Sequence, residues 1–262
     1  MPWDPTQYLK FGDLRLRPAI DLLNRIDVDN PSRVYDIGAG AGNVTRLLKV
    51  RWPNALIVGV DSSEEMLAKA RQMLPELTWE LADLATWRPP APAEVICSNA
   101  ALHWVADHQH LFPALFSTLP DNGVLAVQMP HNFSSPSHLA IAEAVQSGPW
   151  RRKLEPLLRP PPVGEPEFYF DLLAPRAARL DIWQTEYLQA LEGEDPVKEW
   201  TKGTWLKPLL DALAEPERSR FEQRYAELVA AAYPRRADGR TLFPFRRLFI
   251  VAHRGGSSTA SR

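Results

Sequence analysis

The sequence predicts an α/β protein with a mostly parallel sheet and helices on both of its faces. Strand-like and helix-like segments alternate over the first two-thirds of the chain, which is typical of parallel sheets. A near-continuous apolar run at residues 55–60 indicates a strand that is buried on both faces. A glycine cluster at residues 38–42 separates a strand-like segment from a helix-like one, as at the ligand-binding edge of such sheets.

The elements of the first two-thirds follow from local pattern. Ser62 and Glu65 have capping-box spacing with Ser62 at the cap, which predicts a helix that ends near Leu74, before Pro75. The other helices are predicted over residues 14–26, 43–50 and 107–119. The strands are predicted over Arg33–Ile37 and over residues 55–60, 77–81, 94–98 and 123–129.

The pattern changes after Pro130. Residues 156–166 are rich in proline and are expected to form a semi-rigid connector. Two long strands are predicted over residues 180–191 and 242–252. Between them lie helices predicted over residues 197–202 and 215–233, which indicate a helical insertion beside the sheet.

Composition excludes several classes of protein. The chain has 262 residues, 30 basic and 32 acidic, and this balance disfavours a dedicated nucleic-acid binder. No apolar run approaches the ~18 residues of a membrane span, and the first residues contain no signal-peptide core. The single cysteine, Cys97, leaves no internal disulfide and no Cys-based metal site. We therefore expect a cytoplasmic protein without a metal, without nucleic-acid or membrane partners, and present as a monomer or weak dimer.

The glycine cluster is the most specific feature. Its glycines permit a tight turn and close approach of a ligand, and the following helix offers free N–H groups. Asp61, at the end of the second strand, is placed to accept both ribose hydroxyls of a nucleoside. Asp83, after the third strand, is placed to accept from an adenine amino group. The alternatives are a tight turn with ordinary surface acids, and a nicotinamide site, whose G-x-G-x-x-G spacing differs from Gly38-Ala-Gly40-Ala-Gly42.

With Asp36 two residues before the first glycine, this pattern resembles the class I S-adenosylmethionine-dependent methyltransferases. The resemblance implies a Rossmann-like seven-stranded sheet with an antiparallel C-terminal hairpin, and S-adenosylmethionine as cofactor. It places the methionine moiety near Gly38, Ala39 and Asn43. The full set of cofactor-binding residues that we infer is Trp3, Tyr8, Arg17, Asp36, Gly38, Ala39, Gly40, Asn43, Asp61, Ser62, Met66, Asp83, Leu84, Asn99, Ala100 and Trp104.

A closer resemblance covers nearly the whole chain. It is carried by Trp3-Asp4-Pro5, Arg17-Pro18-Ala19, LAVQMP at residues 125–130, WTKGT at residues 200–204, Tyr233-Pro234 and Arg247-Leu248-Phe249. These segments are similar to those of the trans-aconitate methyltransferases, which form a monomethyl ester on one carboxylate of trans-aconitate. Departures from the family pattern are His103 for a common Gln, His131 for Asp, and the residues at Trp205, Lys207 and Arg246.

A carboxylate acceptor has a free pKa near ~4 and is already ionised at pH 7, so no general base is required. We expect arginine to hold its other carboxylates, because the guanidinium pairs two oxygens at once. Arg246 and Arg247 are adjacent on a strand and point to opposite faces, and the resemblance favours Arg247. The predicted acceptor-binding residues are His131, Asn132, Lys207, Tyr233 and Arg247.

Two assignments keep alternatives. His103 is either a base for a hydroxyl or amine acceptor, or a residue that contacts the cofactor and packs beside Trp104. Trp104, Trp3 and Tyr8 are either pocket walls, where a ring face attracts a sulfonium, or core aromatics.

The resemblance also suggests how the chain is organised. The predicted regions are an N-terminal lid and first helix (1–30), a methyltransferase core (31–192), a helical substrate cap (193–241), the final core strand (242–254) and a disordered tail (255–262). The predicted activity is carboxyl O-methylation of trans-aconitate or a similar di- or tricarboxylate. The alternatives are methylation of another small acid or a natural-product hydroxyl, and a nucleoside-binding module without turnover.

Overall fold

The computed structural model describes residues 16–202 and 205–256. The chain forms two compact units. The first comprises Met1–Pro130, Pro162–Thr185 and Arg247–Arg262, and the second comprises His131–Pro161 and Glu186–Arg246. The second unit contains the whole of the predicted insertion at residues 193–241, together with residues 131–161, which the sequence did not group with it.

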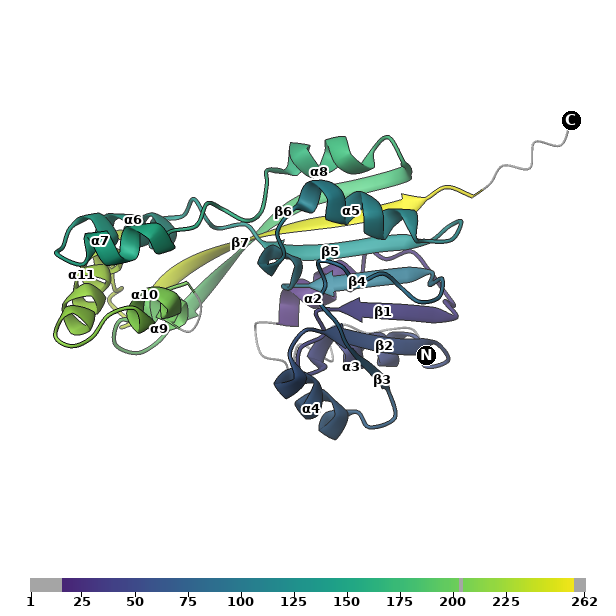
Figure 1. Ribbon diagram of the computed structural model, residues 1–262, viewed down its shortest axis with the longest axis horizontal. Coiled ribbons are helices and arrows are strands. Elements are labelled where there is room, and N and C mark those ends of the chain that lie inside the picture. The colour runs from purple at the N-terminus through teal and green to yellow at the C-terminus, as the bar shows by residue number, and fades with distance from the viewer. Residues whose placement is uncertain (1–15, 203–204, 257–262) are drawn as a thin grey trace, which may run out of the picture. The chain divides into compact units, whose positions relative to one another are not determined.

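A seven-stranded sheet runs in the order β3-β2-β1-β4-β5-β7-β6 (Figure 1). The strands are β1 (Arg33–Ile37), β2 (Leu56–Asp61), β3 (Thr78–Leu81), β4 (Val95–Asn99), β5 (Val124–Pro130), β6 (Ala177–Leu191) and β7 (Thr241–Arg254). Strands β1 to β5 pair in parallel, and β7 pairs antiparallel with β5. The predicted fold, a mostly parallel Rossmann-like sheet with antiparallel C-terminal strands, is confirmed.

The central strands are buried because helices cover the sheet. Val124 to Met129 of β5 are all buried, and every one of these residues except Gln128 is apolar. The helices of the first unit are α2 (Arg17–Leu23), α3 (Asn43–Arg51), α4 (Glu64–Met73), η2 (Leu102–Trp104), α5 (His108–Ser117) and α8 (Pro166–Leu173). The order of the strands reverses beside β1. From β1 the chain adds β2 and then β3 on one side, and it then returns to add β4 and β5 on the other side. Ligands bind open α/β sheets at such a switch point.

The predicted cap of α4 is wrong by one residue. The N-cap is Ser63, whose Oγ accepts from the backbone N–H of Met66 at 3.3 Å, and the helix begins at Glu64. The reason is that Oδ1 of Asp61 accepts from the N–H of Ser63 at 2.9 Å. This bond holds the chain in a turn after β2 and delays the start of the helix.

The second unit is built from helices around its own core. Its helices are α6 (Pro136–Gln146), α7 (Arg151–Leu154), η3 (Glu155–Leu157), α9 (Pro196–Lys202), α10 (Lys207–Asp211) and α11 (Glu217–Ala232). Phe221 and Tyr225 of α11 are fully buried in a cluster with apolar residues of α6 and α10. The hydroxyl of Tyr225 donates to the carbonyl of Ser137 at 3.0 Å, which ties α11 to α6.

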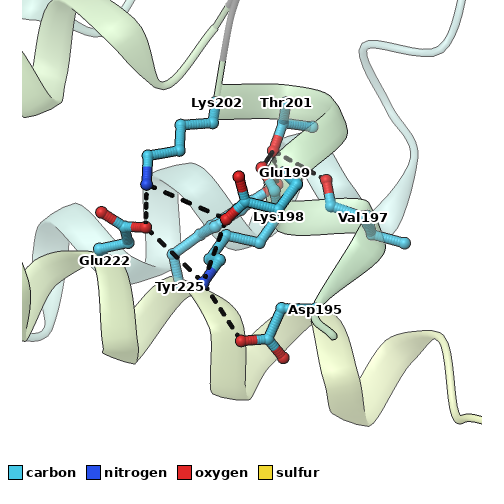
Figure 2. A network of polar contacts seen from close by, with 8 residues as sticks. All are labelled: Asp195, Val197, Lys198, Glu199, Thr201, Lys202, Glu222 and Tyr225. Carbon is cyan, nitrogen blue, oxygen red and sulfur yellow. Dashed lines mark hydrogen bonds and ion pairs between the residues drawn. The ribbon is translucent and has the colours of Figure 1, made fainter. Parts of the chain in front are cut away.

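Figure 2 shows a charged network that joins α9 to α11. Lys202 and Lys198 both approach Oε1 of Glu222, at 2.5 Å and 3.6 Å. The Nζ atom of Lys198 also forms an ion pair with Oδ2 of Asp195 at 3.2 Å. In the same network the hydroxyls of Thr201 and Tyr225 lie 3.0 Å apart and form a hydrogen bond. Several charges in one network contribute more to stability than a single exposed ion pair does.

Candidate active site

The loop between β1 and α3 adopts a conformation that requires glycine. Gly38, Gly40 and Gly42 have φ angles of +79°, +55° and +87°. A Cβ atom at Gly38 would lie 2.0 Å from the Cβ of Ala101, and one at Gly42 would lie 2.9 Å from the ring of Trp79. The loop therefore passes close to the turn after β4, and at Gly38 and Gly42 only glycine fits.

Asp61 connects this loop to the start of α4. Its Oδ2 accepts from the N–H of Gly40 at 2.8 Å, and its Oδ1 accepts from the N–H of Ser63 at 2.9 Å. A carboxylate has about four lone-pair positions, so two positions stay available for hydroxyl donors of a ligand. Asp61 can therefore accept hydrogen bonds from the backbone and from the hydroxyls of a ribose at the same time.

Asp36 lies on β1, beneath the loop. It is 1% exposed, and Oγ1 of Thr45 donates to its Oδ2 at 2.6 Å. Burial raises the pKa of Asp36 to about 7, and the negative charge of Asp61 acts in the same direction. Asp36 is therefore a buried acid that changes charge near neutral pH.

A cavity of about 320 Å³ opens at the carboxyl ends of β1, β2 and β3. Six of the predicted cofactor residues line it: Gly38, Asp61, Ser62, Asp83, Leu84 and Trp104. Four residues that the sequence did not predict also line it: Ala85, Ala101, Val105 and Ala106. The signal that they share is their position, since each lies within four residues of the end of β3, β4 or the short helix η2.

The other predicted cofactor residues lie outside this lining. Ala39, Gly40 and Asn43 belong to the glycine loop or the first turn of α3, Met66 is 40% exposed on α4, and Arg17 begins α2. Asn99 ends β4, and Ala100 follows it with a φ of +53°. Trp3 and Tyr8 lie outside the described residues.

His103 lies in η2 and is 6% exposed. Its ring centroid is 4.6 Å from that of Trp104. Burial, with the positive charge of Arg247 as a second cause, lowers the pKa of His103 to about 3. The imidazole is therefore neutral at pH 7.

The predicted acceptor residues fall in both units. Arg247 belongs to the first unit, is partly buried and pairs with Pro130 across the sheet, whereas Arg246 is exposed. In the second unit, His131 and Asn132 are buried and Lys207 is exposed with an ion pair to Asp211 at 2.7 Å.

Tyr233 is also in the second unit, where its hydroxyl accepts from the N–H of Ser137 at 3.1 Å. It lines a separate cavity of about 150 Å³ between residues 193–197 and α11. That cavity contains no glycine loop and none of the acids that follow the parallel strands, so the cavity at the sheet edge is the candidate active site.

The fold and this site together define a class of protein. Residues 34–123 match the family model described as a methyltransferase domain. Over 92% of this chain and 99% of its own, the YcgJ protein of Bacillus subtilis has the same fold, with a TM-score of 0.58 at 14% identity. Phosphoethanolamine N-methyltransferase 2 of Haemonchus contortus, solved in complex with S-adenosyl-L-methionine, gives a TM-score of 0.54 at 16% identity, over 91% of this chain and 52% of its own. The chain is built as a Rossmann-like methyltransferase.

Curated relatives define the family more narrowly. The trans-aconitate 2-methyltransferase of Azoarcus sp. (strain BH72) is 48% identical over 96% of this chain and 99% of its own length. The enzyme of the same name from Yersinia pestis (strain Pestoides F) is 46% identical over 96% of this chain and 98% of its own. The chain therefore belongs to the trans-aconitate 2-methyltransferase family.

None of the helices in the described part of the chain combines the length and apolar character that crossing a membrane requires.

Proposed function

We propose that this protein transfers the methyl group of S-adenosylmethionine to one carboxylate of trans-aconitate, forming a monomethyl ester. The observation that carries the proposal is the cavity lined by Gly38, Asp61 and Asp83, in a chain with close relatives of that activity over 96% of its length. Bound S-adenosylmethionine would supply an electrophilic methyl group.

The residues at the sheet edge suit a nucleoside ligand. The cavity of about 320 Å³ falls within the usual range for small-molecule sites. Asp61 has unused acceptor positions for ribose hydroxyls, and the exposed ring of Trp104 offers an apolar wall. Asp83, whose Oδ1 accepts from the N–H of Ala85 at 2.9 Å, retains a second oxygen for an amino group.

The chemistry favours positioning over proton transfer. An acceptor carboxylate with a pKa near ~4 is ionised at pH 7, so nothing must remove a proton before the transfer. His103, with its pKa lowered to about 3, would be a weak base, which agrees with a role in packing rather than proton transfer. Arg247 is the cation of the first unit that we assign to a second acceptor carboxylate, because a guanidinium pairs two oxygens.

The roles of His131, Asn132, Lys207, Tyr233, Trp3 and Tyr8 stay predictions, as do the regional assignments of a lid and a substrate cap. The near balance of 30 basic and 32 acidic residues and the buried Cys97 support an enzyme of the cytoplasm that acts on a small molecule without nucleic acid.

The test is a transfer assay with methyl-labelled S-adenosylmethionine and a panel of acceptors. Trans-aconitate should give label that base releases as volatile methanol, which identifies an ester. Base-stable label on a hydroxyl or amine acceptor would replace the carboxylate in this proposal. Donor binding without transfer to any acceptor would instead identify a nucleoside-binding module.

A further inference from the structure

Gln128 is a buried polar side chain without a hydrogen-bond partner among the described residues. It lies in β5 and is 0% exposed, yet within residues 16–202 and 205–256 neither its Oε1 nor its Nε2 makes a hydrogen bond. Buried amides in native proteins are almost always paired, because an unmade hydrogen bond carries the full cost of desolvation. Ser98 on the neighbouring strand β4 is buried but paired, as is usual for a buried polar group, because its Oγ donates to the carbonyl of Ile37 at 2.8 Å.

The strand register gives this amide polar neighbours. Asn99 is the partner of Gln128 on β4, and Arg247 is the partner of Pro130 on β7. Paired residues, and residues two apart on one strand, point to the same face of a sheet. Asn99, Gln128 and Arg247 therefore share one face at the carboxyl ends of β4 and β5. The Oδ1 atom of Asn99 is also buried and has no hydrogen-bond partner in the part of the chain that the structure describes.

The backbone of Gln128 links this group to the candidate active site. Its carbonyl accepts from the N–H of Ala100 at 2.9 Å. Ala100 has a φ of +53°, an uncommon conformation for a residue with a side chain, and the next residue, Ala101, lines the cavity. Gln128 is thus fixed beside the turn that forms one wall of the cavity.

We propose that Gln128 is a specificity-determining residue that donates its Nε2 hydrogens to a carboxylate of the acceptor. This inference rests on the proposed function. A carboxylate is acceptor-only when ionised, so it would satisfy the two N–H groups of the amide. Arg247 on the same face supplies the opposite charge. The unpaired amide is then a binding group kept ready for the ligand, at some cost to the free protein.

The test compares two replacements of Gln128 with one control. Gln128→Met keeps the length of the side chain and removes the amide, and Gln128→Glu keeps its shape but places a negative charge against the acceptor. Ser98→Ala is the control, because it removes a buried polar group whose hydrogen bond is made inside the protein. For each protein we would measure kcat, the KM of both substrates, and the Tm without ligands.

Gln128→Met should raise the KM for trans-aconitate about ten- to a hundred-fold, with the donor KM within about twofold of wild type. Gln128→Glu should raise it further, and circular dichroism should show both folded. The Tm of Gln128→Met should equal or exceed that of wild type, because an unpaired polar group has been removed. Ser98→Ala should lower the Tm and leave the acceptor KM unchanged.

An acceptor KM for Gln128→Met within about threefold of wild type would overturn the inference. If the Tm of Gln128→Met were then also below that of wild type, the amide of Gln128 would be identified as hydrogen-bonded to a buried water rather than kept for a ligand. If wild type methylates trans-aconitate and the variants match it, only the role of Gln128 fails. If wild type methylates no carboxylate, the proposed function fails first, and the role of Gln128 with it.

Discussion

The buried acid Asp36 should make the stability of this protein depend on pH in a direction that can be worked out. Its pKa rises from an ordinary value of 3.8 to about 7, chiefly through burial. Between these two values the folded chain holds a proton that the unfolded chain has released. The free energy of unfolding therefore falls as the pH rises from 4 to 7, and the loss is complete above pH 7.

The size of the effect follows from the same pKa. One pKa unit corresponds to about 1.4 kcal/mol, so a rise from 3.8 to about 7 makes the ionised Asp36 cost about 4 kcal/mol in the folded state. Asp36→Asn keeps an oxygen that can accept from Thr45 and carries no charge at any pH. The stability of the variant relative to wild type should therefore grow by about 1.4 kcal/mol per pH unit and then level off.

The assay is urea unfolding of both proteins from pH 5 to pH 8.5. The pKa values of His103 and His138 are lowered by burial to about 3 and about 4, so these residues destabilise the folded chain as the pH falls. Both histidines are present in both proteins, and their contributions cancel in the difference. The difference should increase by about 2 kcal/mol between pH 5 and pH 7, because Asp36 with a pKa of about 7 is already half ionised at pH 7.

A stability difference that stays constant over this range would refute the argument, because Asp36 would then not titrate near neutrality. Thr45→Val offers a second check. Thr45 is fully buried, and its hydrogen bond lowers the pKa of Asp36. Removing this hydrogen bond should raise the pKa of Asp36 further. The pH at which the stability difference levels off should therefore move above 7.

Three further predictions concern ligand binding. Gly38→Ala should weaken donor binding more than tenfold, because the new methyl group would lie 2.0 Å from the Cβ atom of Ala101. Gly40→Ala places its methyl group where no atom lies within 4 Å, so it should cost only backbone strain of about 1–2 kcal/mol. Equal effects of the two variants on donor binding in calorimetry would contradict the argument from steric crowding at Gly38. Asp61→Ala should weaken donor binding at least tenfold, since the N–H groups of Gly40 and Ser63 and the ribose hydroxyls lose an acceptor; an unchanged donor Kd would remove Asp61 from the site. Arg247→Ala should raise the acceptor KM far more than the donor KM in steady-state assays, and a change of equal size in both would assign Arg247 to the fold rather than to the acceptor.

The strands and helices of the sheet were predictable because their signals are local. The prediction for β1 agrees with its observed bounds, Arg33–Ile37, since its β-branched and aromatic residues end at a glycine. The cap of α4 was wrong because a side chain of the preceding strand, Asp61, binds the N–H of Ser63. The capping-box pattern contains no information about that contact.

The helices α6 and α8 were not predicted. Each begins with a proline, Pro136 and Pro166, in its first turn, and this position is a recognised start signal. In the sequence these prolines stand near other prolines and resemble loop residues. What stabilises α6 is burial against α11, for example through Tyr225, which lies far along the chain. Such packing cannot be inferred from a local window.

The candidate active site also contains residues that the sequence predicts and residues that it does not. The positions of Gly38 and Asp61 at the cavity could be predicted because a glycine loop and an acid that follow successive parallel strands meet at the same edge of the sheet. Gln128 could not, because one glutamine in an apolar strand is indistinguishable by sequence from a core amide with a partner. The register sets Gln128 beside Asn99 and near Arg247, and its buried amide has no hydrogen-bond partner among the described residues. The positions of the glycine loop and of Asp61 are therefore readable from sequence, whereas the grouping of Gln128 with its polar neighbours depends on a register that only the folded sheet shows.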